Sequence, residues 1–157
     1  MKKMRLFTVL IFALSIALVS CNKDNDDNNN GLGGSLTLKH DGSNWSASLA
    51  VAAANTNGVL SVTGSDNSAN QCNVTLYNIP GPGTYQLGGS MSNPNTGRWT
   101  QGLGQNDTYS TMVGQGTGTC TITELTASKV TGTFEFTAKN TAGNMVTISE
   151  GSFSADL

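Results

Sequence analysis

Apolar and polar residues alternate with a period of two along most of the chain from Ser35 to the C-terminus. This alternation is typical of β-strands that place one face in a core and the other in solvent. The predicted core faces are Leu36 and Leu38; Trp45, Ala47, Leu49, Val51 and Ala53; Cys72, Val74 and Leu76; Tyr85 and Leu87; Cys120 and Ile122; Val130, Gly132, Phe134, Phe136 and Ala138; and Val146, Ile148 and Phe153. A further strand is expected from Val59 to Thr63. The pattern contains no convincing helix, because no segment has the 3.6-residue period of an amphipathic one.

Turn signals divide these runs. Asp41-Gly42 and Asn57-Gly58 predict tight β-hairpins, and Pro80-Gly81-Pro82-Gly83 breaks the chain between two strands. The segment from Ser90 to Gly118 is the least regular, with short strands expected near 98–101 and 107–113. Phe153 has the opposite parity from the other apolar residues of its strand, and a β-bulge near Glu150-Gly151 would return it to the core.

About eight to ten short strands at this spacing predict an all-β domain, an antiparallel β-sandwich or barrel, over residues 35–157. The abundance of threonine agrees with this fold, because β-branched residues suit the exposed face of a sheet. The chain carries a formal net charge of −2. Since a nucleic-acid partner calls for a basic face, this balance argues against one.

The N-terminus has the form of a targeting segment. Lys2, Lys3 and Arg5 precede an apolar stretch from Leu6 to Leu18, which at about 13 residues is shorter than a membrane-spanning helix. The stretch ends in Leu18-Val19-Ser20-Cys21, which resembles the lipobox of bacterial lipoproteins. The resemblance implies that residues 1–20 are a signal peptide that is removed and that Cys21 is lipidated. The alternative is an ordinary secretory peptide with a cysteine near its cleavage site by chance.

Residues 21–34 read as a flexible polar tether, because asparagine, aspartate and glycine dominate them and none can build a core. Within it, Asp24, Asp26 and Asp27 resemble the acidic signals that direct lipoproteins of Bacteroidota to the cell surface. The expected location is therefore the outer membrane, lipid-anchored, with the cell surface favoured over the periplasmic face.

Several phrases of the β region resemble a family of small Bacteroidota lipoproteins. They are Gly83-Thr84-Tyr85-Gln86-Leu87-Gly88-Gly89, Thr121-Ile122-Thr123-Glu124, Val130-Thr131-Gly132-Thr133-Phe134-Glu135-Phe136 and Val146-Thr147-Ile148-Ser149-Glu150-Gly151-Ser152-Phe153. The resemblance implies a small all-β domain of unknown function. It brings no catalytic residue, since none is established for that family.

Cys72 and Cys120 both fall on apolar faces of predicted strands. In an oxidising compartment, two cysteines left after lipidation of Cys21 invite a disulfide. The alternative is a pair of buried thiols that pack as small apolar groups.

Catalytic and metal-binding constellations are not recognisable in the sequence. His40 is the only histidine, so a metal site with several histidine ligands is impossible, and a nucleophilic cysteine would have only this residue as its base. His40 itself is expected to be an exposed residue of a hairpin. The available acids include Glu124 and Glu135, which lie in predicted hairpin strands as ordinary solvent-facing carboxylates. We therefore expect no enzyme activity, cofactor or metal.

One cluster suggests binding. Asn95, Arg98, Trp99, Asp107 and Tyr109 lie in the irregular segment, where an aromatic platform beside amide and charged groups would suit a glycan. The alternative is that Trp99 and Tyr109 cover one end of the core. The sequence thus predicts a non-catalytic, lipid-anchored envelope module whose partners are the membrane, through Cys21, and a glycan or an envelope protein. A structural or protein-interaction role in the envelope is the alternative, and a glycan-active enzyme the third.

Overall fold

The computed structural model describes residues 33–157 except 105 and 113. This part of the chain contains eleven strands: β1 (Gly34–His40), β2 (Ser43–Ser46), β3 (Ala50–Thr56), β4 (Val59–Ser65), β5 (Asn70–Tyr77), β6 (Gly83–Gly88), β7 (Thr96–Gln101), β8 (Thr108–Ser110), β9 (Gly116–Leu125), β10 (Lys129–Lys139) and β11 (Met145–Asp156). Within these residues there is no helix long and apolar enough to cross a membrane.

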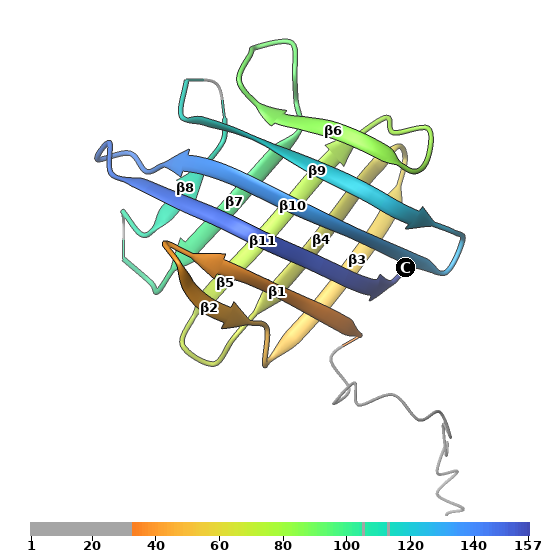
Figure 1. Ribbon diagram of the computed structural model, residues 1–157, viewed down its shortest axis with the longest axis horizontal. Helices are drawn as coiled ribbons and strands as arrows, with labels where there is room; N and C mark the ends of the chain where they lie inside the picture. Colours follow the sequence, from red (N-terminus) through yellow and green to blue (C-terminus); the bar gives the residue numbers. More distant parts are fainter. Residues whose placement is uncertain (1–32, 105, 113) are drawn as a thin grey trace, which may run out of the picture.

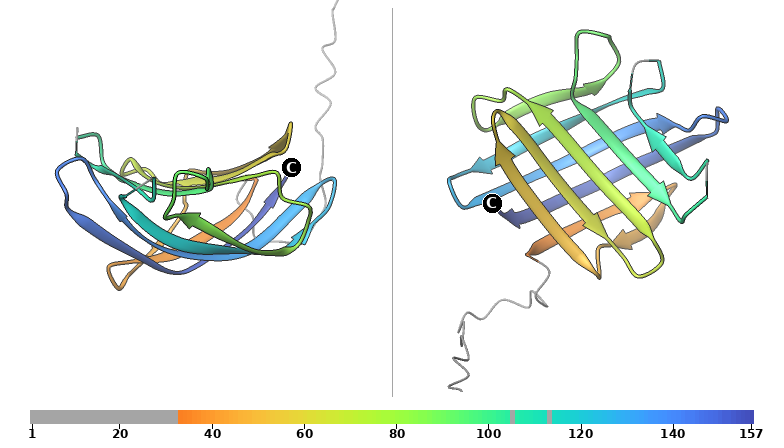
Figure 2. Two further views of the ribbon diagram at one scale, coloured as in Figure 1. Left: turned by 90° about the horizontal axis from the view of Figure 1, so that it is seen from above. Right: turned by 180° about the vertical axis from the view of Figure 1, so that it is seen from behind.

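All eleven strands belong to one antiparallel sheet that curls into a half-barrel (Figure 1). One half, the long layer, has the order β6-β9-β10-β11-β1-β2, and the other half, the short layer, has the order β8-β7-β5-β4-β3. The two halves join where Lys139 of β10 pairs with Ser110 of β8. Seen from above, the long layer bows around the short layer, so their inner faces meet (Figure 2). The predicted all-β antiparallel architecture is confirmed.

The core lies between the two layers. Its buried apolar residues are Leu36, Leu38, Val51, Leu60, Val62, Cys72, Val74, Leu76, Leu87, Trp99, Cys120, Ile122, Val130, Phe134, Phe136, Ala138, Val146, Ile148, Phe153 and Ala155, which form one cluster. Most were predicted from the alternation, because one face of nearly every strand is covered by the facing layer. The part of the chain from β1 to β11 therefore encloses a core of its own.

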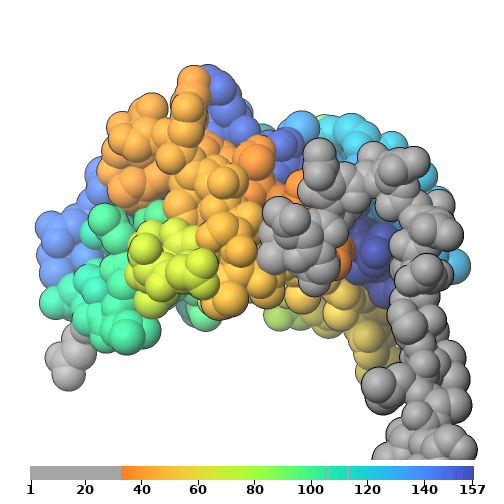
Figure 3. Space-filling view, turned by 90° about the horizontal axis from the view of Figure 1, so that it is seen from below, coloured from red at the N-terminus to blue at the C-terminus, as the bar shows by residue number. Residues whose placement is uncertain are grey.

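The predicted continuous strand through Trp45 and Ala53 is wrong. The chain pairs with β1 up to Ser46 and with β4 from Ala50, and between them it crosses from the long layer to the short one. Backbone hydrogen bonds hold this crossing, from Ala47 N to the Leu36 oxygen at 2.9 Å and from Leu49 N to the Ser65 oxygen at 3.0 Å. Leu49 is consequently 56% exposed. Seen from below, β1, β2 and the crossing form one continuous surface (Figure 3).

The turn and bulge predictions are confirmed. Asp41-Gly42 and Asn57-Gly58 both have positive φ at both positions, as a two-residue hairpin turn requires. In β11 the register against β10 shifts between Phe134, which faces Gly151, and Phe136, which faces Ile148. The shift leaves Ser149 and Glu150 in a bulge, which brings Phe153 into the core.

Candidate functional site

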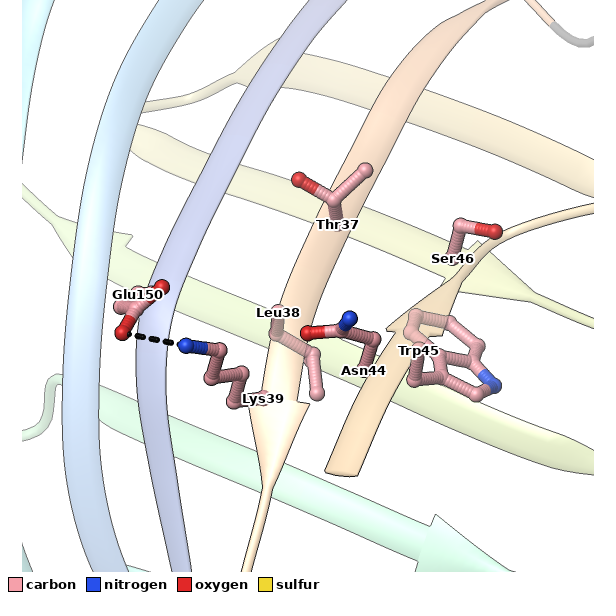
Figure 4. Close-up of a pocket in the computed structure, with 7 residues that line it drawn as sticks. All are labelled: Thr37, Leu38, Lys39, Asn44, Trp45, Ser46 and Glu150. Carbon is pink, nitrogen blue, oxygen red and sulfur yellow. Dashed lines mark hydrogen bonds and ion pairs between the residues drawn. The ribbon is translucent and has the colours of Figure 1, made fainter. Parts of the chain in front are cut away.

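A groove lies on the outer face of the long layer, at the strands β11, β1 and β2 (Figure 4). Its volume is about 330 Å³, at the lower end of the ~300–1000 Å³ range of ligand pockets. The lining residues are Thr37, Leu38, Lys39, Asn44, Trp45, Ser46 and Glu150. Most of them are polar groups from alternate positions of neighbouring strands, so the sheet itself fixes their spacing.

The bulge in β11 supplies the acidic side of the groove. Glu150 has φ +50°, a left-handed conformation that residues other than glycine, asparagine and aspartate seldom adopt. Its carboxylate accepts a hydrogen bond from Lys39 Nζ at 2.7 Å. Both side chains are solvent-accessible, so the pair contributes at most ~1 kcal/mol to stability. Its main effect is to hold the Lys39 ammonium beside Glu150, on the side of β1 away from Asn44, as Figure 4 shows.

An aromatic residue borders the same groove. The indole Nε1 of Trp45 donates to Asp66 Oδ2 at 2.7 Å, and Asp66 also accepts bonds from the amide and side chain of Asn70 and from the amide of Ser68. Burial alone would raise the pKa of Asp66, but these hydrogen bonds outweigh it and lower the pKa. Trp45 is thereby fixed by an ionised carboxylate from the loop between β4 and β5.

A row of hydroxyl groups, here called the hydroxyl row, extends from the groove across the whole long layer. Its six members lie directly opposite one another on neighbouring strands: Thr84, Thr121, Thr133, Ser152, Thr37 and Ser46. Two hydroxyl pairs are hydrogen-bonded at 2.9 Å, Thr84 with Thr121 and Thr37 with Ser152. With strands ~4.8 Å apart, the row is about 24 Å long.

A second hollow of about 300 Å³ lies on the same outer face, across β9, β10 and β11. It is lined by Thr117, Gly118, Glu135, Phe136, Thr137, Thr147, Ile148 and Ser149. Ser149 and Glu150 are neighbours in the bulge, so the two hollows adjoin it from either side. On both sides of the bulge the outer face is therefore hollowed along a surface of hydroxyl, amide and a few charged groups.

The structure places Trp99 directly opposite Tyr109 on β7 and β8, but it does not gather the predicted binding cluster on one exposed surface. Trp99 is 2% exposed and lies on β7 with its side chain in the core, which is the placement that the alternative interpretation expects. Its ring packs against His40 and Trp45, with centroids 5.0 and 5.1 Å away. The neighbouring Arg98 points to the opposite, exposed face, because adjacent residues of a strand alternate.

The other members of that cluster have local structural contacts. Tyr109 is half-buried against the core. The side chain of Asn95 accepts a bond from Tyr77 N at 2.8 Å and donates to the Gln86 oxygen at 3.1 Å. Asp107 accepts a bond from Gly104 N. The alternative interpretation, in which aromatic residues cover the core while polar residues organise turns, describes these contacts.

Cys72 and Cys120 lie in facing layers, on β5 and β9, and are both fully buried as free thiols. Burial raises the pKa of both thiols, that of Cys120 to about 12, and the nearby Cys120 raises that of Cys72 further. The disulfide between them stays a prediction. Cys21 lies outside the described residues. His40 is not the exposed residue expected, because it is stacked on Trp99.

Sequence reasoning missed the groove, although it found one of its causes. The parity change at Phe153 located the bulge that displaces Glu150, but nothing in the local pattern indicated that Lys39 and Asn44 lie beside it. Within residues 33–157, omitting 105 and 113, no group of three histidine, cysteine, aspartate or glutamate residues could hold a metal ion. The arrangement offers hydrogen-bond donors and acceptors on a rigid face.

Comparison with known proteins gives one match. A family model described as a domain of unknown function (DUF6252) matches residues 34–155. The match begins at the first residue of β1 and ends one residue before the last residue of β11. No curated protein and no solved structure matches the chain. Because the family model covers most of the chain, this protein belongs to the DUF6252 family, whose function is unknown.

Proposed function

We propose that this protein is a non-catalytic, lipid-anchored module of the cell envelope that binds a glycan on the outer face of its long layer. The observation that carries the binding proposal is the hydroxyl row together with the groove at its end. Each serine or threonine hydroxyl can donate one hydrogen bond and accept others, which matches the hydroxyl groups of a sugar. The length of the row favours a chain of sugar units over a single one.

The rigidity of this face supports binding without chemistry. Threonine side chains have restricted χ1 rotamers, and here they are mounted on paired strands, so little conformational freedom is lost when a ligand binds. The Lys39–Glu150 pair provides one donor and one acceptor group with balanced charge at the groove. A neutral, hydroxylated polymer fits this composition better than a nucleic acid or another polyanion.

The anchoring half of the proposal rests on the sequence. Lipidated Cys21 holds the protein at the outer membrane, and the mainly polar residues up to Gly33 separate it from β1. The acidic cluster of Asp24, Asp26 and Asp27 supports display at the cell surface. Metabolic labelling of cells with a fatty acid tests this part: the chain should be labelled, Cys21→Ala should not, and an unlabelled wild-type chain would contradict the anchor.

Binding is tested with the chain that lacks residues 1–21, which retains every described residue. Its mobility in native gels that contain xylan, galactomannan or dextran should be retarded by at least one of these polysaccharides. Thr133→Val with Ser152→Ala should remove the retardation, because both hydroxyls lie at the centre of the row. Thr108→Val removes an exposed hydroxyl from the short layer and serves as the matched control.

Two results would overturn the binding proposal. One is unchanged mobility in all three polysaccharides. The other is retardation that the Thr133 and Ser152 substitutions leave intact, since the glycan would then bind elsewhere. If the wild-type chain is not retarded but recovers one stoichiometric envelope protein from membranes, the structural or protein-interaction role replaces glycan binding.

A further inference from the structure

Three strands of the described sheet have an edge without a neighbouring strand: β2, β3 and β6. Such an edge exposes N–H and C=O groups that can pair with another chain, and proteins usually protect it. β2 is protected by its length of four residues. β6 is protected by a loop, since the side-chain amides of Asn93 and Asn95 donate to the carbonyl oxygens of Gln86 and Gly88 at 2.8 to 3.1 Å.

β3 differs from both other edges. It is seven residues long, Ala-Val-Ala-Ala-Ala-Asn-Thr, and contains neither a charge nor a proline. Among the described residues, no side chain donates or accepts a hydrogen bond at β3. The strands behind it, β4 and β5, are also uncharged. From behind, β3 is seen at the margin of the short layer with no strand beyond it (Figure 2).

The hairpin to β4 determines which backbone groups face outward. In a two-residue hairpin the residues that flank the turn, here Thr56 and Val59, form a hydrogen-bonded pair. Ala54 and Ala52 then also bond to β4, because hydrogen-bonded positions alternate. The N–H and C=O groups of Val51, Ala53 and Asn55 point away from β4. Gly33 lies against the Val51 oxygen, so the accessible stretch runs from Ala52 to Thr56.

We propose that this stretch of β3 pairs antiparallel with the same stretch of a second copy of the chain, about a twofold axis at Ala54. In this register Ala53 of each copy exchanges hydrogen bonds with Asn55 of the other. Ala54 faces its own counterpart across a non-hydrogen-bonded pair, where the two backbones are closest, ~4.5 Å between Cα atoms. Ala54 is exposed and small, and it suits that close approach.

A second copy fits this edge better than the other occupants. An antiparallel strand that meets itself across a twofold axis forms an isologous interface, the commonest kind in homo-oligomers. An uncharged strand does so without the repulsion of like charges. The residues before Gly33 are rich in asparagine, aspartate and glycine, which are depleted in strands, so they are poor partners for the edge. The twofold rotation also leaves both Gly33 residues at one height along the axis, as attachment to one membrane needs.

Sedimentation equilibrium of the chain that lacks residues 1–21 tests the pairing. The wild-type chain should dimerise reversibly. Ala54→Lys and Ala54→Glu should each weaken dimerisation about fivefold or more, because each places two like charges directly opposite on the axis. An equimolar mixture of the two variants should restore dimers. Gln71→Lys puts the same charge on an exposed position of β5 and should leave dimerisation unchanged.

Each contrary result overturns the assignment. A wild-type chain that is monomeric at roughly 1 mM has no such interface. If Ala54→Lys dimerises as the wild-type chain does, the copies do not meet at β3. The same conclusion holds if both variants keep the circular dichroism spectrum of the wild type but their mixture forms no dimers. If only a chain shortened to begin at Gly33 dimerises, the residues before Gly33 cover the edge instead.

Discussion

Substitution of Cys72 by alanine distinguishes a disulfide-bonded core from one with two thiols. Cys72 is fully buried between Gly64 and Trp99 of the neighbouring strands, and Cys120 is fully buried in the facing layer. A bridge would close a loop of about 49 residues and stabilise the fold by ~4 kcal/mol on the chain-entropy estimate. Loss of the buried sulfur alone costs only ~1 kcal/mol. We therefore expect Cys72→Ala to lower the unfolding free energy of the oxidised protein by about 5 kcal/mol.

The timing of bridge formation follows from the raised pKa of both thiols. Because the thiolate is the reactive form, buried thiols with high pKa values exchange slowly, and the bridge should form before the two layers close. Protein refolded with oxidised and reduced glutathione should give a urea midpoint that falls when a reductant is added. Cys72→Ala should not respond to the reductant, which makes it the matched control.

The disulfide is refuted if the refolded chain that lacks residues 1–21 titrates two free thiols in denaturant and its urea midpoint is the same with and without reductant. In that case Cys72→Ala should cost only the ~1 kcal/mol of a small cavity. Cys72 and Cys120 would then act as apolar packing groups.

Two further predictions concern the packing and the electrostatics. Gly118→Ala should lower the free energy of unfolding in urea by about 3 kcal/mol, because a Cβ there would lie 2.2 Å from the backbone oxygen of Glu135. Gly114→Ala is the control: an added Cβ has no atom within 4 Å, and the residue's φ of +75° should cost about 1 kcal/mol. Equal losses for the two variants would contradict this packing. Asp66→Asn should lower stability at neutral pH by about 1 kcal/mol, since the folded state holds the carboxylate pKa below its ordinary 3.8. This stabilisation is present above the pKa of Asp66 in the unfolded chain and is lost as pH falls through its pKa in the folded chain. Plots of unfolding free energy against pH for the wild type and Asp66→Asn should therefore converge below pH 3.8. A difference that persists in acid would show that the ionised carboxylate is not the cause.

The sequence predicted the fold where the pattern was local. The alternate positions Cys72, Val74 and Leu76 are buried as predicted, and the Asp41-Gly42 and Asn57-Gly58 turns have the required positive φ values. Even the bulge at Glu150 was predictable, because Phe153 could reach the core in no other way. The exception is the segment through Leu49, where unbroken alternation concealed a crossing between layers that depends on backbone bonds to β1 and β4.

The candidate site was much less predictable. The sequence left Trp99 open between a binding surface and the core, because composition does not show which side of a strand faces the other layer. The hydroxyl row depends on the register of six strands, because its members are spread along the sequence from Thr37 to Ser152. No local signal fixes such a register, since it results from the hydrophobic contacts of the assembled sheet.

The sequence by itself therefore determined the strands, most of the core residues and the family resemblance, because side-chain alternation and turn chemistry act over a few residues. Only the tertiary structure decided that Trp99 is enclosed, that Lys39 meets Glu150 and that β3 is left with an open edge. These features arise when distant strands pair and one half of the sheet curls over the other. Long-range pairing of this kind determines which polar groups share a surface and which backbone groups lack a partner.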